Sequence, residues 1–582
     1  MPVRYDSAGL RDVLVNHSSP FSHKLEKVQP GYHVVLLERY KVLAQLTATN
    51  RVGFHQYVYD LDNNTLTPGI VLDLGGELGP SILTKGSFTK VSDTEIRGSV
   101  VNGATIRRTK ECPVFFSLMF NHPIKRIYLY EKGKIVTDAE NWSGSDGKVL
   151  IEFEKPAGLS LRMKAAISFT SEQGAYNNQQ EIPDWNFYSV LNDAQNEWEE
   201  LLGRIRVRGG TDEQQRRFYT DLYHALMGRR VISDLDGSYS DNTGAERVVR
   251  KVPLTEEGKP KFAMYNSDSF WGAQWTLNTL WQLVYPEKAE EFCNSFIEYY
   301  KNGGLIPRGP SGGDYTYVMT GASSTPFFVS AYQKGISGFD AGLAYEGLKK
   351  NHLPGGMMSK AGYEHKTSRG GGVEKYIENG YVPYPLSSKQ YGLHQDGAGM
   401  TLEYAYQDWT LAQLAKALGK TEDMEMFMKR SLSYRNLYNH ATGFIQPKDS
   451  TGNWKAPFDP LEYDNGFIEG NAAQFTWFVP HDMQGLFELM GGKEKAVERL
   501  NEQFDQSRSI RFCNEHPGNT PRFVNDKRTW INYSNQPNMQ AAFIFNHAGA
   551  PWLTQYWSRE VINTVYSGLT PDVGYYGDED QG

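Results

Sequence analysis

Residues 467–482 read FIEGNAAQFTWFVPHD, and the rest of the chain is best understood outward from this stretch. Glu469 stands beside Gly470 and Asn471, and an aromatic and amide run follows: Gln474, Phe475, Trp477 and Phe478. Aromatic rings stack on the apolar face of a pyranose, and an apolar wall keeps a carboxylic acid protonated near neutral pH. The pattern is therefore typical of a sugar-cleaving site. The alternative is a buried helix start, with Glu469 as a first-turn acid satisfied by backbone N–H groups.

A second acidic cluster ends the sequence. Residues 575–582 read YYGDEDQG, which places three acids in a row after two tyrosines and a glycine. Such a run is usually a solvated tail. Because the preceding sequence is well patterned, Asp578 and Asp580 are also candidates for a general base or a cation site.

Composition narrows the class of protein. The 582 residues suggest two or more domains, and 39% hydrophobic and 22% charged residues fit a soluble globular chain. A net charge of −8 without a basic block argues against nucleic acid as a partner. Aromatic residues reach 13%, which suits carbohydrate binding, although most such rings are expected in the core.

Cysteine spacing and hydropathy exclude further classes. Cys112, Cys293 and Cys513 lie far apart, so a zinc site or a disulfide framework is not expected. No apolar run approaches the ~18 residues of a membrane span. The first residues, MPVRYDSAGL, lack a basic region followed by an apolar core, so no signal peptide is expected in them.

The first part of the chain, residues 1–183, predicts a β-sandwich domain. Short β-rich runs such as 33–37, 69–72 and 149–153 are bounded by turn residues. Many short strands with polar turns favour two packed sheets. Residues 184–202 then have helical spacing and 204–208 alternate, so 184–209 is predicted to be a linker helix followed by one connecting strand.

The last part, residues 210–582, predicts a helical domain. Helical segments alternate with Gly- and Pro-rich loops and group into pairs, for example 270–285 with 286–302, and 401–418 with 421–438. About six such pairs indicate an (α/α)6 toroid with its site in the loops at one end. The loops at 235–243, 306–318, 360–395 and 512–536 are rich in Gly, Tyr, Trp, Asp and Asn.

Several long motifs, in order, make the sequence resemble glycoside hydrolase family 92, the calcium-dependent exo-acting α-mannosidases. The motifs that carry this resemblance are LTATNRVGFH (46–55), FYTDLYHAL (218–226), DLDGSY (234–239), TLEYAYQDW (401–409), AQLAKALGK (412–420), EGNAAQFTWFVPHD (469–482), FNHAGAPWLTQ (545–555) and GDEDQG (577–582). The family fold, an N-terminal β-sandwich plus an (α/α)6 domain, agrees with the patterns above.

The resemblance also implies an inverting mechanism and its residues. The general acid falls on Glu469 and the base on Asp578 and Asp580, with ~6.5–9.5 Å between acid and base to admit a water. Calcium is expected on oxygen ligands from Gln536, Asp580 and Asn535, although Asn535-Gln536-Pro537 could be a plain turn. Predicted sugar contacts are Trp271, Asn471, Gln474, Trp477 and Asp408, with core support an equal alternative for Asp408.

Some positions depart from the family pattern. The family's Trp-Asp-Thr, whose Asp binds the terminal sugar, falls on Trp271-Gly272-Ala273. Ala473 replaces a Trp, residues 319–325 read MTGASST, and Met539-Gln540 replace two histidines. A lost hydrogen bond to a sugar hydroxyl can weaken recognition by a few kcal/mol. The leading expectation is an exo-acting mannosidase-like enzyme with an altered substrate. Two alternatives are a non-catalytic glycan-binding paralogue and an (α/α)6 glycosidase for another α-linked sugar.

Other motifs carry less weight. Asp234 and Asp236 in DLDGSY lack the spacing of an EF-hand, because Gly237 comes too early and no Glu stands at the twelfth position. His481 and Asp482 are expected to support the site or cap a helix rather than form a catalytic dyad. The partner is expected to be a glycan or oligosaccharide, without nucleic acid or a membrane span. The resemblance alone implies a periplasmic or extracellular location, and the sequence leaves the oligomeric state open.

Overall fold

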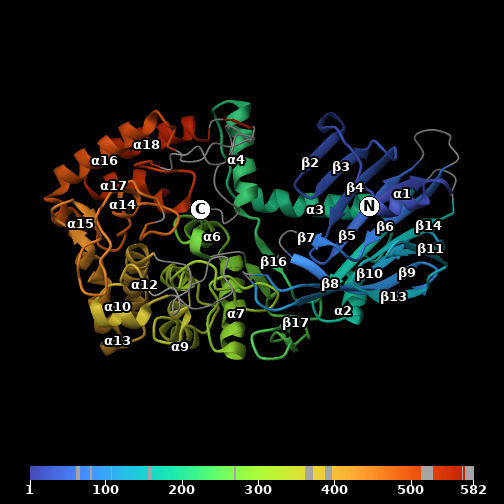
Figure 1. Ribbon diagram of the computed structural model, residues 1–582, viewed down its shortest axis with the longest axis horizontal. Helices are drawn as coiled ribbons and strands as arrows, with labels where there is room; N and C mark the ends of the chain where they lie inside the picture. The colour runs from blue at the N-terminus through green and yellow to red at the C-terminus, as the bar shows by residue number, and fades with distance from the viewer. Residues whose placement is uncertain are drawn as a thin grey trace. The chain divides into compact units, whose positions relative to one another are not determined.

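The computed structural model describes residues 1–59, 66–78, 81–105, 108–154, 160–267, 270–360, 371–386, 396–463, 465–512, 528–566 and 568–569. The chain divides into two compact units (Figure 1). The first comprises Met1–Arg206, Arg230–Asn266 and Gly312–Asp314, and the second comprises Val207–Arg229, Ser267–Ser311 and Tyr315–Gly582. The division is therefore not collinear with the sequence.

The first unit contains two antiparallel sheets. One has the order β1 (Pro2–Tyr5), β6 (Thr67–Asp73), β14 (Gly147–Phe153), β11 (Ile124–Glu131) and β12 (Lys134–Thr137). The other has the order β13 (Asn141–Gly144), β8 (Ser81–Ser92), β9 (Glu95–Asn102), β10 (Cys112–Phe120), β15 (Ser160–Ser168), β5 (Val52–Val58), β4 (Val42–Ala48), β3 (Tyr32–Leu37) and β2 (Glu26–Gln29), with β7 (Glu77–Leu78) beside β8.

One hydrophobic core joins the two sheets. Ile70 and Ile151 of the first sheet pack in the same cluster as Phe88 and Ile96 of the second. Alternation creates these inner faces: in β15, Leu161 and Met163 of this cluster are buried while Ser160 and Arg162 are partly exposed. The predicted β-sandwich is therefore confirmed. Helix α1 (Leu10–Val15) and helix α2 (Glu172–Asn178) pack against this unit.

The segment after the sandwich is a helix without the expected strand. Helix α3 runs over Phe187–Leu202 and begins where Asn186 accepts the N–H of Ser189, three residues later than expected. Residues 204–208 form no strand, so that prediction is wrong. Arg204, Arg206 and Arg208 alternate with apolar residues, but no neighbouring strand completes a ladder with them, and alternation needs a partner to become a strand.

Residues 230–266 contribute short strands to the first unit. They include β16 (Arg229–Val231), β17 (Ser238–Asp241), β18 (Val248–Lys251) and β19 (Tyr265–Ser267). The expected loop at 235–243 therefore contains a strand, with β17 paired to β18. This hairpin agrees with the rejection of an EF-hand for the DLDGSY motif.

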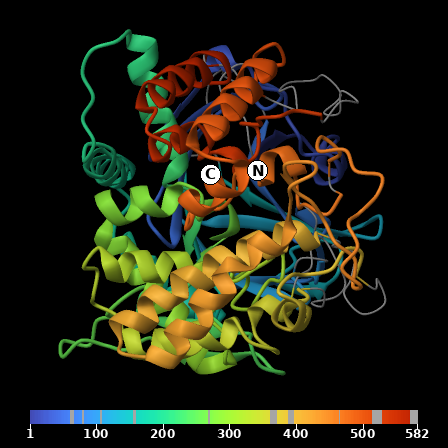
Figure 2. The ribbon, with the colours of Figure 1, turned by 90° about the vertical axis from the view of Figure 1, so that its left-hand side faces the viewer.

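The second unit is helical (Figure 2, green to red). Its helices are α4 (Asp212–Ala225), α5 (Phe270–Ala273), α6 (Leu277–Val284), α7 (Pro286–Gly303), α8 (Ser324–Gln333), α9 (Ala341–Asn351), α10 (Val373–Asn379), α12 (Gly397–Ala417), α13 (Thr421–Arg430), α14 (Ala472–Phe475), α15 (Met483–Met490), α16 (Lys493–Arg508), α17 (Ile544–His547) and α18 (Pro551–Thr564). Short two-residue strands, β20 (Tyr438–Asn439) and β21 (Phe444–Ile445), follow α13.

Consecutive helices contact each other as pairs, including α6 with α7, α8 with α9, α12 with α13, α15 with α16, and α17 with α18. Most residues of α12 are buried, and it also contacts α8 and α9, so it is a central helix of the unit. The predicted order, a β-rich domain followed by a helical domain, is confirmed. Closure of the helix pairs into a toroid stays a prediction.

Candidate functional site

Glu469 lies just before a helix and not inside one. Its φ of 53° is left-handed, and its side chain is half-buried. Helix α14 (Ala472–Phe475) begins three residues later and is capped by Asn471, which accepts the N–H of Gln474 at 3.0 Å. The alternative of a first-turn acid is therefore wrong, because a positive φ places Glu469 outside the helical region. Left-handed backbone in a non-glycine residue is uncommon and concentrates at functional sites.

The carboxylate of Glu469 meets the segment predicted to hold a cation. The amide Nδ2 of Asn535 donates to Oε2 of Glu469 at 2.9 Å. Asn535 also caps the 3₁₀ turn Gln536–Asn538, because its Oδ1 accepts the N–H of Gln536 at 2.8 Å. The fold thus brings the predicted acid into contact with Asn535, one of the three predicted calcium ligands, across 66 residues of sequence. Asp578 and Asp580 lie outside the described residues.

The two predicted amide contacts, Asn471 and Gln474, hold the site together. Both side chains are buried, and both donate to the carbonyl oxygen of Thr529 at 3.0 Å. Gln474 also donates to the hydroxyl of Thr529 at 2.9 Å. These bonds join the Glu469 segment to the residues that precede Asn535. Sequence patterns alone offered no signal for Thr529, because its role depends on a contact distant in sequence. The predicted sugar contacts of Asn471 and Gln474 stay predictions.

Aromatic side chains form a dense cluster behind the acid segment. Trp271 and Trp477 are fully buried, and their indole N–H groups donate to Glu403 at 2.9 Å and Gln503 at 2.6 Å. Trp275 lies between Trp271 and the acid motif: its ring centroid is 5.9 Å from that of Trp271 and 3.9 Å from that of Phe478. In this conformation Trp271 and Trp477 present no exposed ring face. Stacking of sugar on these two tryptophans therefore stays a prediction.

Asp408 lies in an enclosed polar network. Its carboxylate contacts His352 Nδ1 at 2.8 Å, Arg430 Nε at 2.8 Å and the hydroxyl of Tyr376 at 3.0 Å. Asp408 and His352 are both fully buried, and burial lowers the pKa of His352. These contacts are those of a core support, the alternative that the sequence left open for this residue.

Glu403 is a second buried acid in the same helix, α12. It accepts hydrogen bonds from Trp271 Nε1 and from the hydroxyl of Thr320, both at 2.9 Å. Burial raises the pKa of Glu403 to about 7, and these two bonds and the charge of Arg308 oppose the rise only in part. Glu403 therefore keeps its proton in the folded protein until the pH approaches about 7, and its carboxyl group fixes Trp271 in the ring cluster.

The predicted metal site draws its oxygen donors from more than one segment. Among the described residues, no three His, Cys, Asp or Glu side chains gather closely enough to hold a metal ion. Asn535 and Gln536 nevertheless offer amide oxygens beside a carboxylate, and hard oxygen donors of this kind suit calcium. The chemistry of the donor set therefore fits the predicted ion, with Asp580 as the remaining predicted ligand.

The His-Asp pair that ends the acid motif has a structural role. The carboxylate of Asp482 accepts the N–H of Gly485 at 2.9 Å and so caps α15. His481 Nε2 lies 2.9 Å from the carbonyl oxygen of Ser431, and burial lowers its pKa to about 4. The expectation of supporting or capping groups is confirmed.

Comparison with protein families settles which family this site belongs to. The model of the glycosyl hydrolase family 92 catalytic domain matches residues 173–582, and that of the family's N-terminal domain matches residues 3–168. The chain belongs to glycoside hydrolase family 92. It is a glycoside hydrolase, as the EGN and GDED motifs led us to expect.

Solved structures of family 92 support the assignment. A family 92 α-mannosidase of Bacteroides thetaiotaomicron is 26% identical, with a TM-score of 0.81, 97% of this chain covered and 70% of that chain. The same protein has been solved in complex with mannoimidazole. A family 92 inverting mannosidase of Bacteroides thetaiotaomicron VPI-5482 is 27% identical, with a TM-score of 0.81 and coverage of 100% and 74%.

One curated relative is described as secreted. An uncharacterized secreted glycosidase of Arthroderma benhamiae is 24% identical over 620 residues, which cover 96% of this chain and 68% of the relative. Within the described part of this family 92 hydrolase, no helix is long and apolar enough to cross a membrane.

Proposed function

We propose that this family 92 hydrolase is an exo-acting, inverting α-mannosidase-like enzyme that removes terminal α-linked sugars from glycans. The observation that carries the proposal is the contact between Glu469 and Asn535 at 2.9 Å. It joins the expected general acid to the expected cation ligands in one half-buried site. The solved relatives named as α-mannosidase and inverting mannosidase support the same chemistry.

In the proposed reaction, Glu469 protonates the leaving glycosidic oxygen. Asp578 and Asp580 act on the opposite face of the sugar, where an ionised carboxylate removes a proton from the attacking water. A single displacement of this kind inverts the anomeric carbon and needs ~6.5–9.5 Å between acid and base. The amide of Asn535 orients the Glu469 carboxylate, so that its other oxygen faces the leaving group.

We further propose a calcium ion held by Gln536, Asn535 and Asp580. When bound, the ion supplies a Lewis-acidic contact to vicinal hydroxyls of the terminal sugar. Asn535 lies directly beside Glu469, so the sugar hydroxyls and the leaving oxygen would be positioned by neighbouring groups.

Mannose is the leading sugar, because one solved relative binds mannoimidazole. Gly272 stands where the family pattern has a sugar-binding Asp, so recognition of the terminal sugar has to use other groups. The glycan partner and a periplasmic or extracellular location belong to the same proposal, supported by a relative described as secreted.

The decisive experiment replaces Glu469 by Gln. Turnover of aryl α-mannoside, α-glucoside and α-galactoside is measured with the wild type, Glu469→Gln and the matched control Glu462→Gln. Glu462 is an exposed acid in the neighbouring loop, paired with Lys455 at 2.9 Å. For Glu469→Gln alone, we expect turnover to fall at least a thousandfold on substrates whose leaving group needs protonation. The melting temperature should be unchanged. Full activity in Glu469→Gln would refute the acid assignment.

The same substrates also test the stereochemistry of the reaction and the identity of the sugar. NMR of the first product formed distinguishes inversion from retention. A preference for glucoside or galactoside over mannoside would replace mannose as the substrate class, and absence of turnover on all three would favour a glycan-binding protein.

A further inference from the structure

The segment 319–325, which leads into α8, is held in place by buried side chains of α12. The hydroxyl of Thr320 donates to Oε2 of Glu403 at 2.9 Å, and both side chains are fully buried. One helical turn further along α12, Oε1 of Gln407 accepts the backbone N–H of Ala322 at 2.7 Å. Successive turns of one helix therefore fix two points of the segment.

Two further contacts hold the middle and the end of the segment. Arg308, which is 1% exposed, donates through Nη1 to the carbonyl oxygen of Gly321 at 2.7 Å. The hydroxyl of Thr325 lies 2.9 Å from Nε2 of His352, and Nδ1 of the same ring lies 2.8 Å from Asp408 of α12. Buried polar contacts thus hold the segment along its length.

The backbone is strained at the start of the segment. Met319 has a left-handed φ of 65°, and its side chain is 2% exposed. Left-handed residues other than glycine persist only where their surroundings enforce them, and they concentrate at functional sites. Met319 belongs to the same hydrophobic cluster as Trp271 and Phe478. The strained residue therefore lies in the core that backs the acid motif.

Glu403 connects this segment to the acid motif. While its Oε2 holds the segment, its Oε1 accepts the indole N–H of Trp271 at 2.9 Å. Trp271 packs against Trp275 and Trp275 against Phe478, with ring centroids 5.9 Å and 3.9 Å apart. Phe478 belongs to the stretch 469–482, which carries the proposed acid. One buried carboxyl group thus joins the segment 319–325, through three rings, to the element that bears the acid.

We infer that Glu403 is a positioning residue of the active site, whose protonated form holds the three rings and the segment 319–325 in the arrangement that catalysis needs. The inference rests on the proposed glycosidase function. Because the side chain of Glu403 is fully buried, it acts through Trp271 and the rings behind the acid motif and not on the sugar itself.

Burial makes this arrangement sensitive to pH. A charge on the enclosed carboxyl group is stable only when water reaches it, so ionisation of Glu403 favours an opened arrangement. Of the facing charges, Arg308 favours the ionised form and Asp396 the protonated form. Neither α5 nor α8 carries an Asp, Glu, His, Lys or Arg. Further along α12, Asp408 is paired with Arg430 at 2.8 Å. Activity should therefore fall as Glu403 loses its proton.

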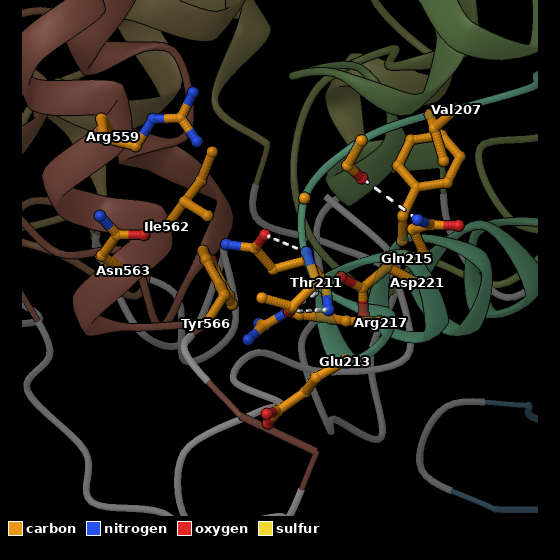
Figure 3. A pocket seen from close by; sticks show the side chains of 14 residues that line it. Val207, Thr211, Glu213, Gln215, Arg217, Asp221, Arg559, Ile562, Asn563 and Tyr566 are labelled. Atoms are coloured by element: carbon orange, nitrogen blue, oxygen red, sulfur yellow. Dashed lines mark hydrogen bonds and ion pairs between the residues drawn. The ribbon is translucent and has the colours of Figure 1, made fainter.

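The test measures kcat/KM at pH 5.5 and pH 8.0 on the aryl α-glycoside that the wild type cleaves best, with the full chain throughout. Glu403→Gln keeps polar partners for both donors but does not titrate. Glu469 has to be protonated in both proteins, so the ratio of their kcat/KM values isolates Glu403. Glu213→Gln is the control, because Glu213 is an exposed acid beside the cavity between α4 and α18 and does not belong to this network (Figure 3).

We expect the ratio of kcat/KM for Glu403→Gln to that of the wild type to rise at least threefold from pH 5.5 to pH 8.0, and the ratio for Glu213→Gln to stay constant. A ratio for Glu403→Gln that is independent of pH would overturn the inference, since a purely structural role would change only the melting temperature. Absence of wild-type turnover at either pH would be a different result, which would refute the proposed function and the inference with it.

A second set of variants tests the hold on the segment. Thr320→Val removes the hydroxyl that meets Glu403 and should lower kcat/KM at least fivefold at pH 5.5, whereas Thr320→Ser should restore it. Thr410→Val is the matched control, because the buried hydroxyl of Thr410 donates within its own helix, to the carbonyl oxygen of Tyr406 at 2.8 Å. Equal kcat/KM for Thr320→Val and Thr410→Val would overturn the inference. If Thr320→Val does not fold, the pH ratio of Glu403→Gln decides.

Discussion

At the scale of single residues, Glu469 combines a strained backbone with a directed side chain. A left-handed non-glycine residue is disfavoured by roughly 1–2 kcal/mol, so the surrounding contacts must enforce it. The neighbours that do so are a helix capped at Asn471 and the amide of Asn535. The strain projects the carboxylate away from α14 and toward the 3₁₀ turn Gln536–Asn538.

The calcium proposal predicts a reversible loss of activity on chelation. Because Asn535 contacts Glu469, removal of the ion should disturb the sugar and the acid together. We expect EDTA to lower the rate at least tenfold and added Ca²⁺ to restore it. Gln536→Ala should need a higher Ca²⁺ concentration for half-maximal rate, measured by titration of the chelated enzyme. An undiminished rate after thorough chelation would remove calcium from the mechanism.

Glu403 predicts a pH-dependent stability. Its pKa of about 7 in the folded protein exceeds the usual 4.5, so the folded state keeps a proton that the unfolded state loses. Stability from this group is therefore fully present below about pH 4.5 and falls as pH rises to about 7. Glu403→Gln keeps a polar partner for Trp271 without titrating.

The comparison of Glu403→Gln with the wild type isolates this effect. We expect the variant to gain stability relative to the wild type as pH rises across that window, by about 3 kcal/mol in total. Denaturant midpoints at pH 4.5, 5.5, 6.5 and 7.5 provide the measurement. A difference between the two proteins that is constant with pH would show that Glu403 ionises normally in the fold.

At the scale of elements, caps set the helix boundaries. Asp482 accepts the N–H of Gly485 and also the hydroxyl of Tyr434 at 2.6 Å, while Arg435 lies 3.1 Å away. Asp482→Ala should destabilise the protein by about 1–3 kcal/mol, because a helix cap and a buried hydroxyl lose their acceptor. Asp482→Asn should keep most of the cap. Equal melting temperatures for Asp482→Ala and the wild type would contradict this role.

The sequence predicted those elements that have a clear local pattern and missed those that do not. Local β-rich runs and helical spacing located β3 and α7 closely. The segment 270–285, expected as one helix, is broken into α5 and α6 at residues 274–276, where Thr276, a residue of low helix propensity, is the N-cap of α6. Helix α10 was missed inside an expected loop. It is short and begins and ends at Gly372 and Gly380, whose positive φ values interrupt any longer pattern.

In the candidate site, too, the sequence predicted individual residues but not the contacts between distant ones. Motif order predicted Glu469, Asn535 and Gln536 as members of one site, and the fold brings Glu469 and Asn535 together. The anchoring by Thr529 and the pairing of Glu403 with Trp271 join residues far apart in sequence. No local pattern encodes which distant donor meets a buried acceptor, so these contacts needed the structure.

At the scale of the whole molecule, one buried carboxylate helps to fasten residues 230–266 to the first unit, although the sequence on both sides of Asp234 also includes parts of the second unit. Asp234 accepts hydrogen bonds from the hydroxyls of Ser168 at 2.9 Å and Thr170 at 2.5 Å, and from Asn178 Nδ2 at 2.8 Å. These bonds fasten residues 230–266 to β15 and α2 within the first unit. The local sequence pattern of residues 230–266 is that of an ordinary β-hairpin. Composition along the chain therefore cannot predict that this segment belongs to the first unit.

Asp234→Ala should therefore loosen the first unit while the helical unit stays intact. Three buried donors lose their acceptor, which costs about 3 kcal/mol or more. Asp236→Ala is the matched control, since Asp236 is an exposed acid in the same turn, paired with Lys251 at 2.8 Å. Hydrogen exchange of the full chain, followed by mass spectrometry, should show faster exchange in peptides from 230–241 and 168–178 for Asp234→Ala alone.

Peptides from α12 should exchange as in the wild type, because α12 belongs to the other unit and its core does not include Asp234. Equally faster exchange in α12 would mean that the two units unfold together. Asp234 would then not stabilise the first unit separately.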